Sequence, residues 1–396
     1  MGTVAPSQIR ILFIIILLAQ FYSGLVAIVV PIYAYALGAS PFLIGVVGTA
    51  GAVTYSIMPV VFGKLSDKFG RKRLLLISMI LYGVICILYI LSQDVFNVIV
   101  IRLLESISLA ILWPTLEALI VDVYAKESVE TAMRLYNIAW GSALIFAPAV
   151  GGMLITALTV KAPFYLACAI SFLACLPVLR VTAHMEVAGS DPVSPKAVGR
   201  VSRETWMAVI STYMLSFVTG IIVSLFPAFA LSLNFLAVDV GIIMLVFGIG
   251  RIVMFYFNIN IERRMEKKTM LLLSGLIFII ATITVALIPS LPVFLVCFAL
   301  LGFGMGMAFS TSISMMMRTD ALKRGSAAGK FESLMGLGFL MGPFLGGLVA
   351  EIDGRGPFLL GSGVSAGISI ALVRLMRKRA SPYGTQSTSS SFGAPS

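Results

Sequence analysis

Long apolar segments, separated by short polar ones, make up almost the whole chain. Each apolar segment holds about 20 residues or more, the length that an α-helix needs to cross the hydrocarbon core of a bilayer. Such segments must be helical, because lipid offers no hydrogen-bond partners to an unpaired backbone. The pattern therefore predicts an all-α integral membrane protein with twelve transmembrane helices. We expect these helices at residues 9–37, 41–62, 74–92, 95–122, 132–158, 162–180, 205–232, 238–259, 269–288, 291–317, 327–350 and 355–375.

Composition points to the same class of protein. Hydrophobic residues make up 59% of the 396 residues and charged residues only 11%, against roughly 25% charged residues in soluble domains. The four cysteines lie in apolar segments, and the single histidine, His184, lies in a polar one. These positions offer neither a metal site nor a Cys/His or Ser/His/Asp catalytic set. The sequence also lacks the phosphate-binding G-x-x-x-x-G-K-[ST] pattern, so we predict that the protein is not an enzyme.

The net charge of +11 comes from basic residues on one side of the predicted helices. With the N-terminus inside, 24 of the 28 lysines and arginines fall in cytoplasmic segments, whereas Lys161 and Arg355 fall outside and Arg102 and Arg251 lie within helices. This excess is typical of cytoplasmic loops. We therefore predict a multi-pass protein of the cell membrane with both termini cytoplasmic. The charge reflects this orientation, and we expect no nucleic-acid partner.

One polar, Pro/Gly/Ser-containing segment at 181–204 divides the chain. We interpret it as a cytoplasmic linker between a six-helix bundle at 1–180 and another at 205–376. The low-complexity tail at 377–396 is predicted to be disordered.

The two halves repeat each other. Pro31 and Gly45 recur as Pro227 and Gly241, both 196 residues later. The segment WGSALIFAPAVGG at 140–152 recurs 195 residues later as MGLGFLMGPFLGG. Internal repeats of this kind are typical of secondary transporters, which bind their substrate between the halves near the bilayer midplane.

The segment GKLSDKFGRKR at 63–73 concentrates charge in this apolar chain. It resembles motif A of the major facilitator superfamily, G-x-L-x-D-[RK]-x-G-R-[RK]-[RK], through Gly63, Asp67, Gly70 and Arg71 among others. The resemblance implies a cytoplasmic loop that latches one conformational state, with both glycines allowing a tight turn. The alternative is a plain positively charged membrane anchor. The second copy keeps Glu262 and basic residues but lacks the glycines.

The fourth predicted helix contains Arg102, Glu105 and Ser106. They partly resemble the family motif R-x-x-Q-G, which implies a role of the arginine in proton coupling. Charges inside a membrane are costly and usually face a wet cavity or the bundle interior. We regard Arg102 and Glu105 as the first candidates for proton coupling, followed by Glu117 and Glu332. The alternative is an Arg–Glu pair that only neutralises itself.

Small residues and a proline recur in the fifth and eleventh predicted helices. This pattern resembles motif C, which the family associates with twelve-helix drug/proton antiporters, although close helix packing explains much of it. The candidate packing residues are Gly141, Pro148, Gly151, Gly152, Gly342, Pro343, Gly346 and Gly347.

The resemblance also implies that the first, fourth, seventh and tenth helices line the substrate cavity. Polar and aromatic residues of these helices are the candidates, although such residues are more often ordinary packing residues. The candidates are Gln20, Tyr33, Trp113, Tyr213, Phe217 and Phe309.

These observations predict a secondary active transporter that exports small, fairly apolar molecules in exchange for protons. We expect a monomer in the lipid bilayer that has no cofactor and is driven by the proton gradient. One alternative is a proton symporter or uniporter for a neutral metabolite. The other is a superfamily-like receptor or assembly platform that does not transport.

The predicted orientation can be tested with single cysteines on a background that lacks the four native ones. Ser40→Cys lies in a predicted external loop and Ser66→Cys in a predicted cytoplasmic one. A membrane-impermeant maleimide added to intact cells should label the first and spare the second. Labelling of both from outside would contradict the orientation.

Overall fold

The structure, a computed structural model, describes residues 6–123, 129–181, 203–318 and 324–377. Within these ranges the chain forms helices joined by short turns, and no strand occurs in them. The helices are α1 Pro6–Ala36, α2 Pro41–Phe69, α3 Arg71–Leu91, α4 Val95–Val123, α5 Val129–Ala157, α6 Ala162–Leu179, α7 Arg203–Ser232, α8 Ala237–Glu262, α9 Lys267–Leu287, α10 Leu291–Arg318, α11 Arg324–Ala350 and α12 Gly356–Arg377.

The helices lie where the apolar pattern predicted them. The bounds agree within three residues, except at the end of α2. There the helix continues through Gly63 to Phe69, so the expectation that Gly63 forms the turn was wrong. The turn is made at Gly70 alone, whose φ of 90° is a conformation that favours glycine.

Nine of the helices are long and apolar enough to cross a membrane, judged on the described residues. The other three, α2, α5 and α11, show shorter apolar stretches at Pro41–Thr54, Ile145–Ala157 and Leu334–Ala350. The chain is therefore a multi-pass membrane protein, and the number of twelve spans stays a prediction.

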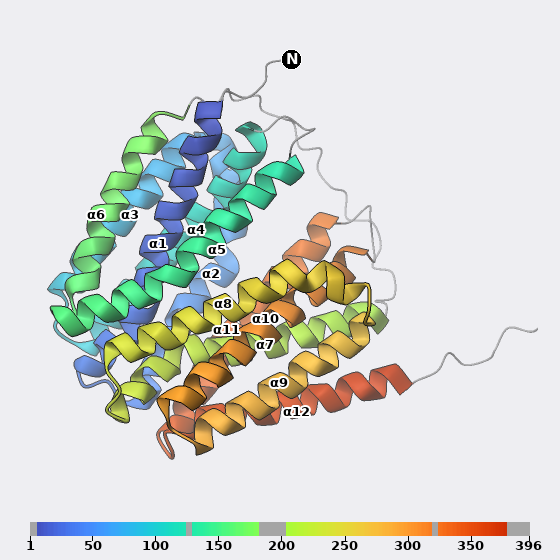
Figure 1. The fold of residues 1–396 in the computed structure, drawn as a ribbon. Coiled ribbons are helices and arrows are strands. Elements are labelled where there is room, and N and C mark those ends of the chain that lie inside the picture. The colour runs from blue at the N-terminus through green and yellow to red at the C-terminus, as the bar shows by residue number, and fades with distance from the viewer. Residues whose placement is uncertain (1–5, 124–128, 182–202, 319–323, 378–396) are drawn as a thin grey trace, which may run out of the picture.

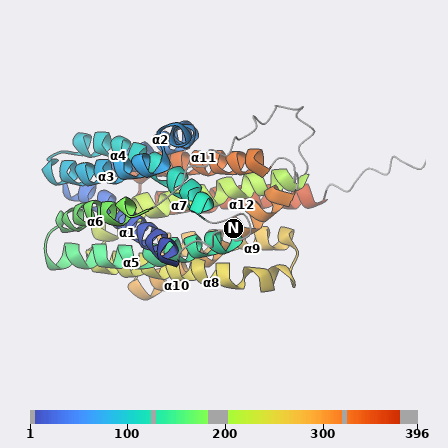
Figure 2. The same ribbon diagram turned by 90° about the horizontal axis from the view of Figure 1, so that it is seen from above.

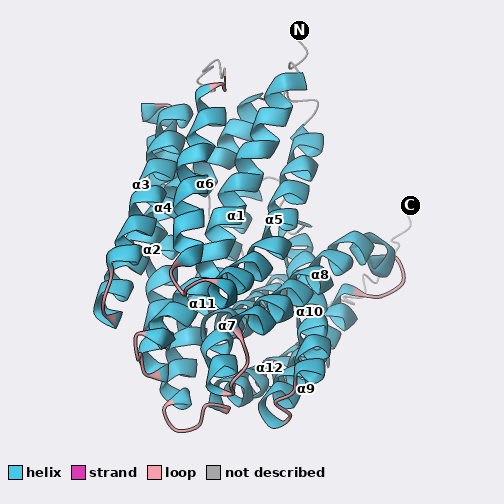
Figure 3. Ribbon diagram, turned by 60° about the vertical axis from the view of Figure 1, so that its left-hand side comes forward, coloured by secondary structure: helices cyan, strands magenta, loops and turns pink. Residues whose placement is uncertain are grey.

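Figures 1 and 2 show the helices in two groups. We call α1–α6 the first bundle and α7–α12 the second bundle. Figure 3 shows both bundles from another side, with α11 and α8 of the second bundle next to α2 and α5 of the first. The predicted linker, apart from its end residues, and nearly all of the predicted tail lie outside the described residues.

The bundles meet along two seams, α2 against α11 and α5 against α8. Glycines let the backbones touch there. A Cβ on Gly347 would lie 3.0 Å from the Gly45 Cα, and one on Gly241 would lie 2.7 Å from the Pro148 carbonyl oxygen. A Cβ on Gly152 would collide with the Ala237 carbonyl. These contacts lie where α2 and α8 begin and where α5 and α11 end.

Neighbouring glycines of the motif C-like segments pack inside each bundle. A Cβ on Gly151 would lie 3.4 Å from Ile28 of α1, and one on Gly346 would lie 2.7 Å from Leu225 of α7. A Cβ on Gly342 would collide with the Phe217 carbonyl of α7. Each segment thus packs against its own bundle through one glycine and against the other bundle through the adjacent glycine.

The seam predicts opposite effects for two glycine-to-alanine changes. Alanine is the better helix former by about 1 kcal/mol, but Gly45→Ala would collide with the Pro343 carbonyl of the other bundle. A Cβ on Gly363 meets nothing within 4 Å, so Gly363→Ala is the matched control. We expect Gly45→Ala to lower the thermal unfolding midpoint in detergent and Gly363→Ala to leave it unchanged or raise it. A Gly45→Ala protein as stable as Gly363→Ala would show that the seam tolerates a side chain.

Candidate functional site

A buried ion pair lies in α4. Arg102 and Glu105 are one helical turn apart, and Arg102 Nη1 donates hydrogen bonds to both Glu105 carboxylate oxygens at 2.7 Å. The Glu105 side chain is 1% exposed and that of Arg102 is 17% exposed. Buried charges are costly unless they are paired and hydrogen-bonded, and this geometry pairs the two charges. Arg102 Nε is buried without a hydrogen-bond partner among the described residues.

Two tyrosines of α3 complete the shell around Glu105. The Tyr89 hydroxyl donates to Glu105 Oε2 at 2.7 Å, and the Tyr82 hydroxyl donates to Oε1 at 3.2 Å. The two rings are seven residues apart, so they lie on one face of α3. Sequence reasoning missed both tyrosines. Their spacing was visible in the sequence, but nothing there indicated that this face meets α4.

The pair also contacts α2, the helix that forms the seam with α11. The Ser106 hydroxyl donates to the Gly51 carbonyl at 2.8 Å. A Cβ on Gly51 would lie 2.9 Å from Arg102 Nε. On the other side, the Tyr22 ring of α1 lies 4.4 Å from that of Tyr82. We call Tyr22, Tyr82, Tyr89, Arg102 and Glu105 the carboxylate cluster; it joins α1, α3 and α4 and touches α2.

The other candidate carboxylates do not join this cluster in the described residues. Glu117 is exposed and lies about 18 Å from Glu105 along α4, at 1.5 Å per residue. The Glu332 side chain lies outside the described residues.

The predicted cavity residues fall into different environments. Tyr33 lies inside the first bundle, where its hydroxyl donates to the Ser92 carbonyl at 2.7 Å and its ring lies 5.5 Å from that of Phe164. The structure thus directs Tyr33 toward α3 and α6. Gln20 is 5% exposed and Phe217 is 1% exposed, so both are also nearly fully buried.

The remaining cavity candidates are partly buried. The Tyr213 ring lies 5.8 Å from that of Phe217 within α7, and the Phe309 ring of α10 lies 5.9 Å from that of Phe255 in α8. Trp113 packs against the main apolar core.

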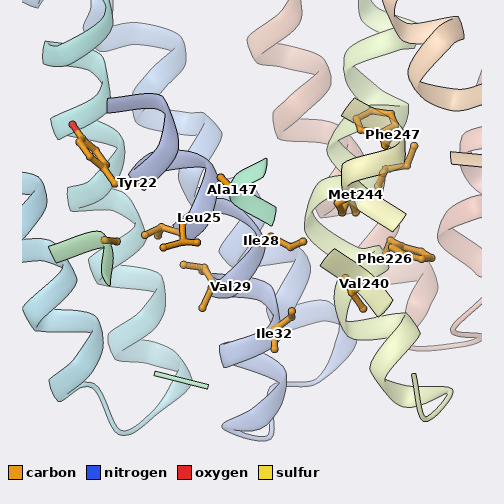
Figure 4. Packing of buried hydrophobic residues seen from close by; sticks show 14 of the residues in the cluster. Tyr22, Leu25, Ile28, Val29, Ile32, Ala147, Phe226, Val240, Met244 and Phe247 are labelled. Carbon is orange, nitrogen blue, oxygen red and sulfur yellow. The ribbon is translucent and has the colours of Figure 1, made fainter. Parts of the chain in front are cut away.

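That core is continuous across both bundles. Figure 4 shows Ile28 and Ile32 of α1 on one side and Val240 and Met244 of α8 on the other. The buried middle of the molecule is therefore apolar where the bundles meet.

The motif A-like segment is only partly described. Gly70 precedes α3, and Arg71 is its first residue. The next residue, Lys72, donates to the Leu179 and Val181 carbonyls at 2.6 and 2.9 Å, at the end of α6. The Asp67 side chain lies outside the described residues, so its predicted role as a latch stays a prediction.

The second copy of this segment has its own polar contacts. Asn258 Nδ2 donates to Glu262 Oε1 at 3.1 Å, and Lys267 Nζ lies 3.9 Å from Glu262 Oε2. Lys267 also contacts the Ser314 hydroxyl of α10. This turn is thereby tied to α10.

Two hydrogen bonds cross between the bundles at the seam ends, and the repeat relates them. The Phe42 N–H of α2 donates to Glu351 Oε1, just after α11, at 2.9 Å. The Val238 N–H of α8 donates to the Thr156 hydroxyl of α5 at 3.1 Å. Phe42 and Val238 are 196 residues apart, and Thr156 and Glu351 are 195 apart. Each bundle thus caps the start of a helix in the other, once with a carboxylate and once with a hydroxyl.

In the described residues, no group of three or more His, Cys, Asp or Glu side chains has the arrangement of a metal site. The carboxylate cluster offers one carboxylate, one guanidinium and tyrosine hydroxyls, with the Ser106 hydroxyl beside it.

Comparison with known proteins identifies the family of this chain. Residues 12–322 match the family model of the Major Facilitator Superfamily. The chain is 24% identical over 375 residues to "Quinolone resistance protein NorA" of Staphylococcus aureus, covering 92% of this chain and 96% of the relative. It is 26% identical over 367 residues to "Multidrug resistance protein 1" of Bacillus subtilis, covering 88% and 91%.

Solved structures share the fold. The nucleoside transporter NupG superposes with a TM-score of 0.78 at 17% identity, covering 94% of this chain and 100% of that one. A bacterial homolog of the human lysosomal transporter Spinster, in an inward-facing and unoccupied conformation, gives 0.77 at 15% identity, covering 96% and 100%.

The cross-bundle cap on α2 predicts a response to acid. Hydrogen bonds from the Ser40 hydroxyl and the Phe42 N–H lower the pKa of Glu351 from its ordinary value of 4.5. The stabilisation of the closed contact is therefore complete above pH 4.5 and is lost as the pH falls through the lowered value. Spin labels at Leu37→Cys and Ile352→Cys should move apart in acid.

Glu351→Gln should abolish this acid response, whereas Thr156→Val, which removes the neutral cap, should keep it. The facing segment 37–41 carries no titratable side chain, and Asp353 and Arg355 share the loop of Glu351. An equal acid response in wild type and Glu351→Gln would assign the response to another group of this loop, such as Asp353, and not to Glu351.

Proposed function

Because the chain belongs to the Major Facilitator Superfamily, a family of transporters, we propose that it exports small, fairly apolar molecules in exchange for protons. Transport and the absence of enzymatic chemistry follow from the family. The direction and substrate class are supported by two relatives named for quinolone and multidrug resistance. The apolar middle of the molecule suits an apolar substrate.

The proposed proton coupling rests on the buried carboxylate of Glu105. A coupling group must bind a proton in one state of the cycle and release it in another. Arginine cannot do this, because it stays protonated in proteins. Glu105 is a carboxylate, a group that can do this, and its two oxygens accept four hydrogen bonds from Arg102, Tyr82 and Tyr89. In this proposal, a proton that binds Glu105 displaces one of these donors.

The contact with α2 connects this step to alternating access. Ser106 and Arg102 touch Gly51 of α2, and the same helix contacts α11 of the second bundle. A shift of Arg102 away from Glu105 therefore acts directly on a helix of the seam. Substrate and proton would then compete through the conformation of α2, as antiport requires.

We also propose that the motif A-like segment closes the transporter on its predicted cytoplasmic face. In this proposal Asp67 holds the bundles together on the predicted cytoplasmic face. Asp67→Asn should then increase the inward-facing fraction. Spin labels on the predicted cytoplasmic face should move apart, and labels at Leu37→Cys and Ile352→Cys should move closer together at neutral pH. Unchanged distances in a normally expressed protein would contradict the latch and leave the segment as a membrane anchor.

A non-transporting platform is the competing function. A platform has no use for a buried carboxylate that accepts four hydrogen bonds, an arrangement that costs desolvation free energy. Flux of a panel of apolar dyes and drugs from proteoliposomes under an imposed pH gradient separates the two functions. Flux above protein-free liposomes supports transport, and its absence for every compound supports the platform.

The sharpest test replaces the coupling carboxylate. Glu105→Gln should lower pH-gradient-driven flux at least tenfold and spare substrate binding and exchange, because the amide cannot carry the proton. Glu105→Asp keeps the charge and should retain part of the driven flux. Both proteins need a check of thermal stability, since removing one member of a buried ion pair costs about 3–5 kcal/mol.

Glu117→Gln is the matched control, because Glu117 lies on the same helix but is exposed. Driven flux that survives in Glu105→Gln but fails in Glu117→Gln or Glu332→Gln would move the proton site to the failing position.

A further inference from the structure

A groove lies on the outer face of the second bundle, between the first turns of α7 and the last turns of α12. Its volume is about 510 Å³, and its walls are mostly apolar. The lining residues include Trp206, Ile210, Gly367, Ala371 and Arg374. This face belongs to two membrane helices and points away from the first bundle (Figure 1).

Basic side chains gather at one end of the groove. A second hollow, next to it, is lined by Arg374 and Arg377, so Arg374 lies between the two. Arg203, the first residue of α7, is also exposed at this level, and Glu204 is the only acidic residue in the first turn of α7. The polar end of the groove therefore favours an anion.

Two glycines of α12 leave the other end of the groove open. A Cβ on Gly363 or Gly367 would meet nothing within 4 Å. The helix that carries them, α12, has the smallest buried share of the nine candidate spans, 28%. The open face thus runs along α12 from Gly363 to Arg374.

The length of this face matches one leaflet. Eleven residues separate Gly363 from Arg374, a rise of about 16 Å at 1.5 Å per residue. Half of a hydrocarbon core of about 30 Å is about 15 Å. Trp206 lies beside the basic end and is 51% exposed, as aromatic residues at the membrane–water interface commonly are. The arginines therefore lie at headgroup level and Gly363 near the midplane.

We propose that this groove binds one anionic phospholipid. Its phosphate lies between Arg374 and Arg377, and one acyl chain runs over Ala371, Gly367 and Gly363. Basic pockets between membrane helices bind anionic headgroups in this way, and each arginine contributes about a fivefold gain in affinity.

A second copy of the chain is the competing occupant, because Gly363 and Gly367 have the spacing of a helix-dimer motif. The arginines disfavour it. In a two-fold membrane dimer the two α12 helices run parallel, which brings the two Arg374 side chains to the same level, where they repel each other. A phosphate at the same place neutralises them.

The test measures lipid retention by native mass spectrometry of the full-length protein, purified in detergent and titrated with phosphatidylglycerol or phosphatidylcholine. We expect wild type to retain one phosphatidylglycerol and to prefer it over phosphatidylcholine. Arg374→Gln with Arg377→Gln should weaken phosphatidylglycerol binding about 25-fold. Arg263→Gln with Arg264→Gln removes the same charge from the α8–α9 turn and should leave retention unchanged.

Gly367→Leu tests the acyl-chain part separately, because it fills the groove and keeps every charge. It should also lose the lipid. Equal retention in wild type and in the Arg374/Arg377 double variant would overturn the proposal. The proposal would also be overturned if soluble glycerol 3-phosphate, which has no acyl chain, displaced the bound phosphatidylglycerol as well as added phosphatidylglycerol does. A dimer in wild type that Gly367→Leu dissociates would assign the groove to a second copy.

Discussion

Direct contact between backbones holds the two bundles of this transporter together. Inside a membrane, helices gain little from the hydrophobic effect on association, so close packing has to supply the attraction. Gly45, Gly152, Gly241 and Gly347 provide it by removing the side chains that would keep the seams apart. The hydrogen bonds from Phe42 and Val238 can form between the bundles only because these backbones approach so closely.

The carboxylate cluster depends on the same arrangement. Arg102 packs against Gly51, at a point where a larger residue on α2 would push the guanidinium away from Glu105. The ion pair is therefore held from two sides, by the tyrosines of α3 and by the backbone of α2. The ion pair of α4 and the seam with α11 therefore both contact α2.

The sequence was sufficient for the helices and for the family, because both depend on local pattern. Apolar length alone located eleven helices within three residues, and the motif A-like and motif C-like segments indicated the superfamily that the family model confirms. It was insufficient at Gly63, because a glycine inside a helix looks the same in sequence as a glycine in a turn. Of Gly63 and Gly70, only Gly70 adopts the positive φ that marks the turn.

Contacts between helices were harder to predict than the helices. A helix that is apolar all round shows no stripe that reveals its rotation, so the sequence did not indicate that Tyr33 lies against Phe164. Tyr82 and Tyr89 were missed for the same reason. Glu351 was missed because its partner is a backbone N–H, which leaves no trace in residue identity.

The backbone contact at the seams has a consequence for the evolution of this protein. The second copy of the motif A-like segment has lost its glycines, yet Gly45 and Gly241 persist at matching places in the two halves. A turn can be rebuilt with other residues, whereas a place where two backbones touch accepts no side chain at all. We therefore expect the seam glycines to outlast the charged loop as the halves diverge. They form the more durable record of the duplication.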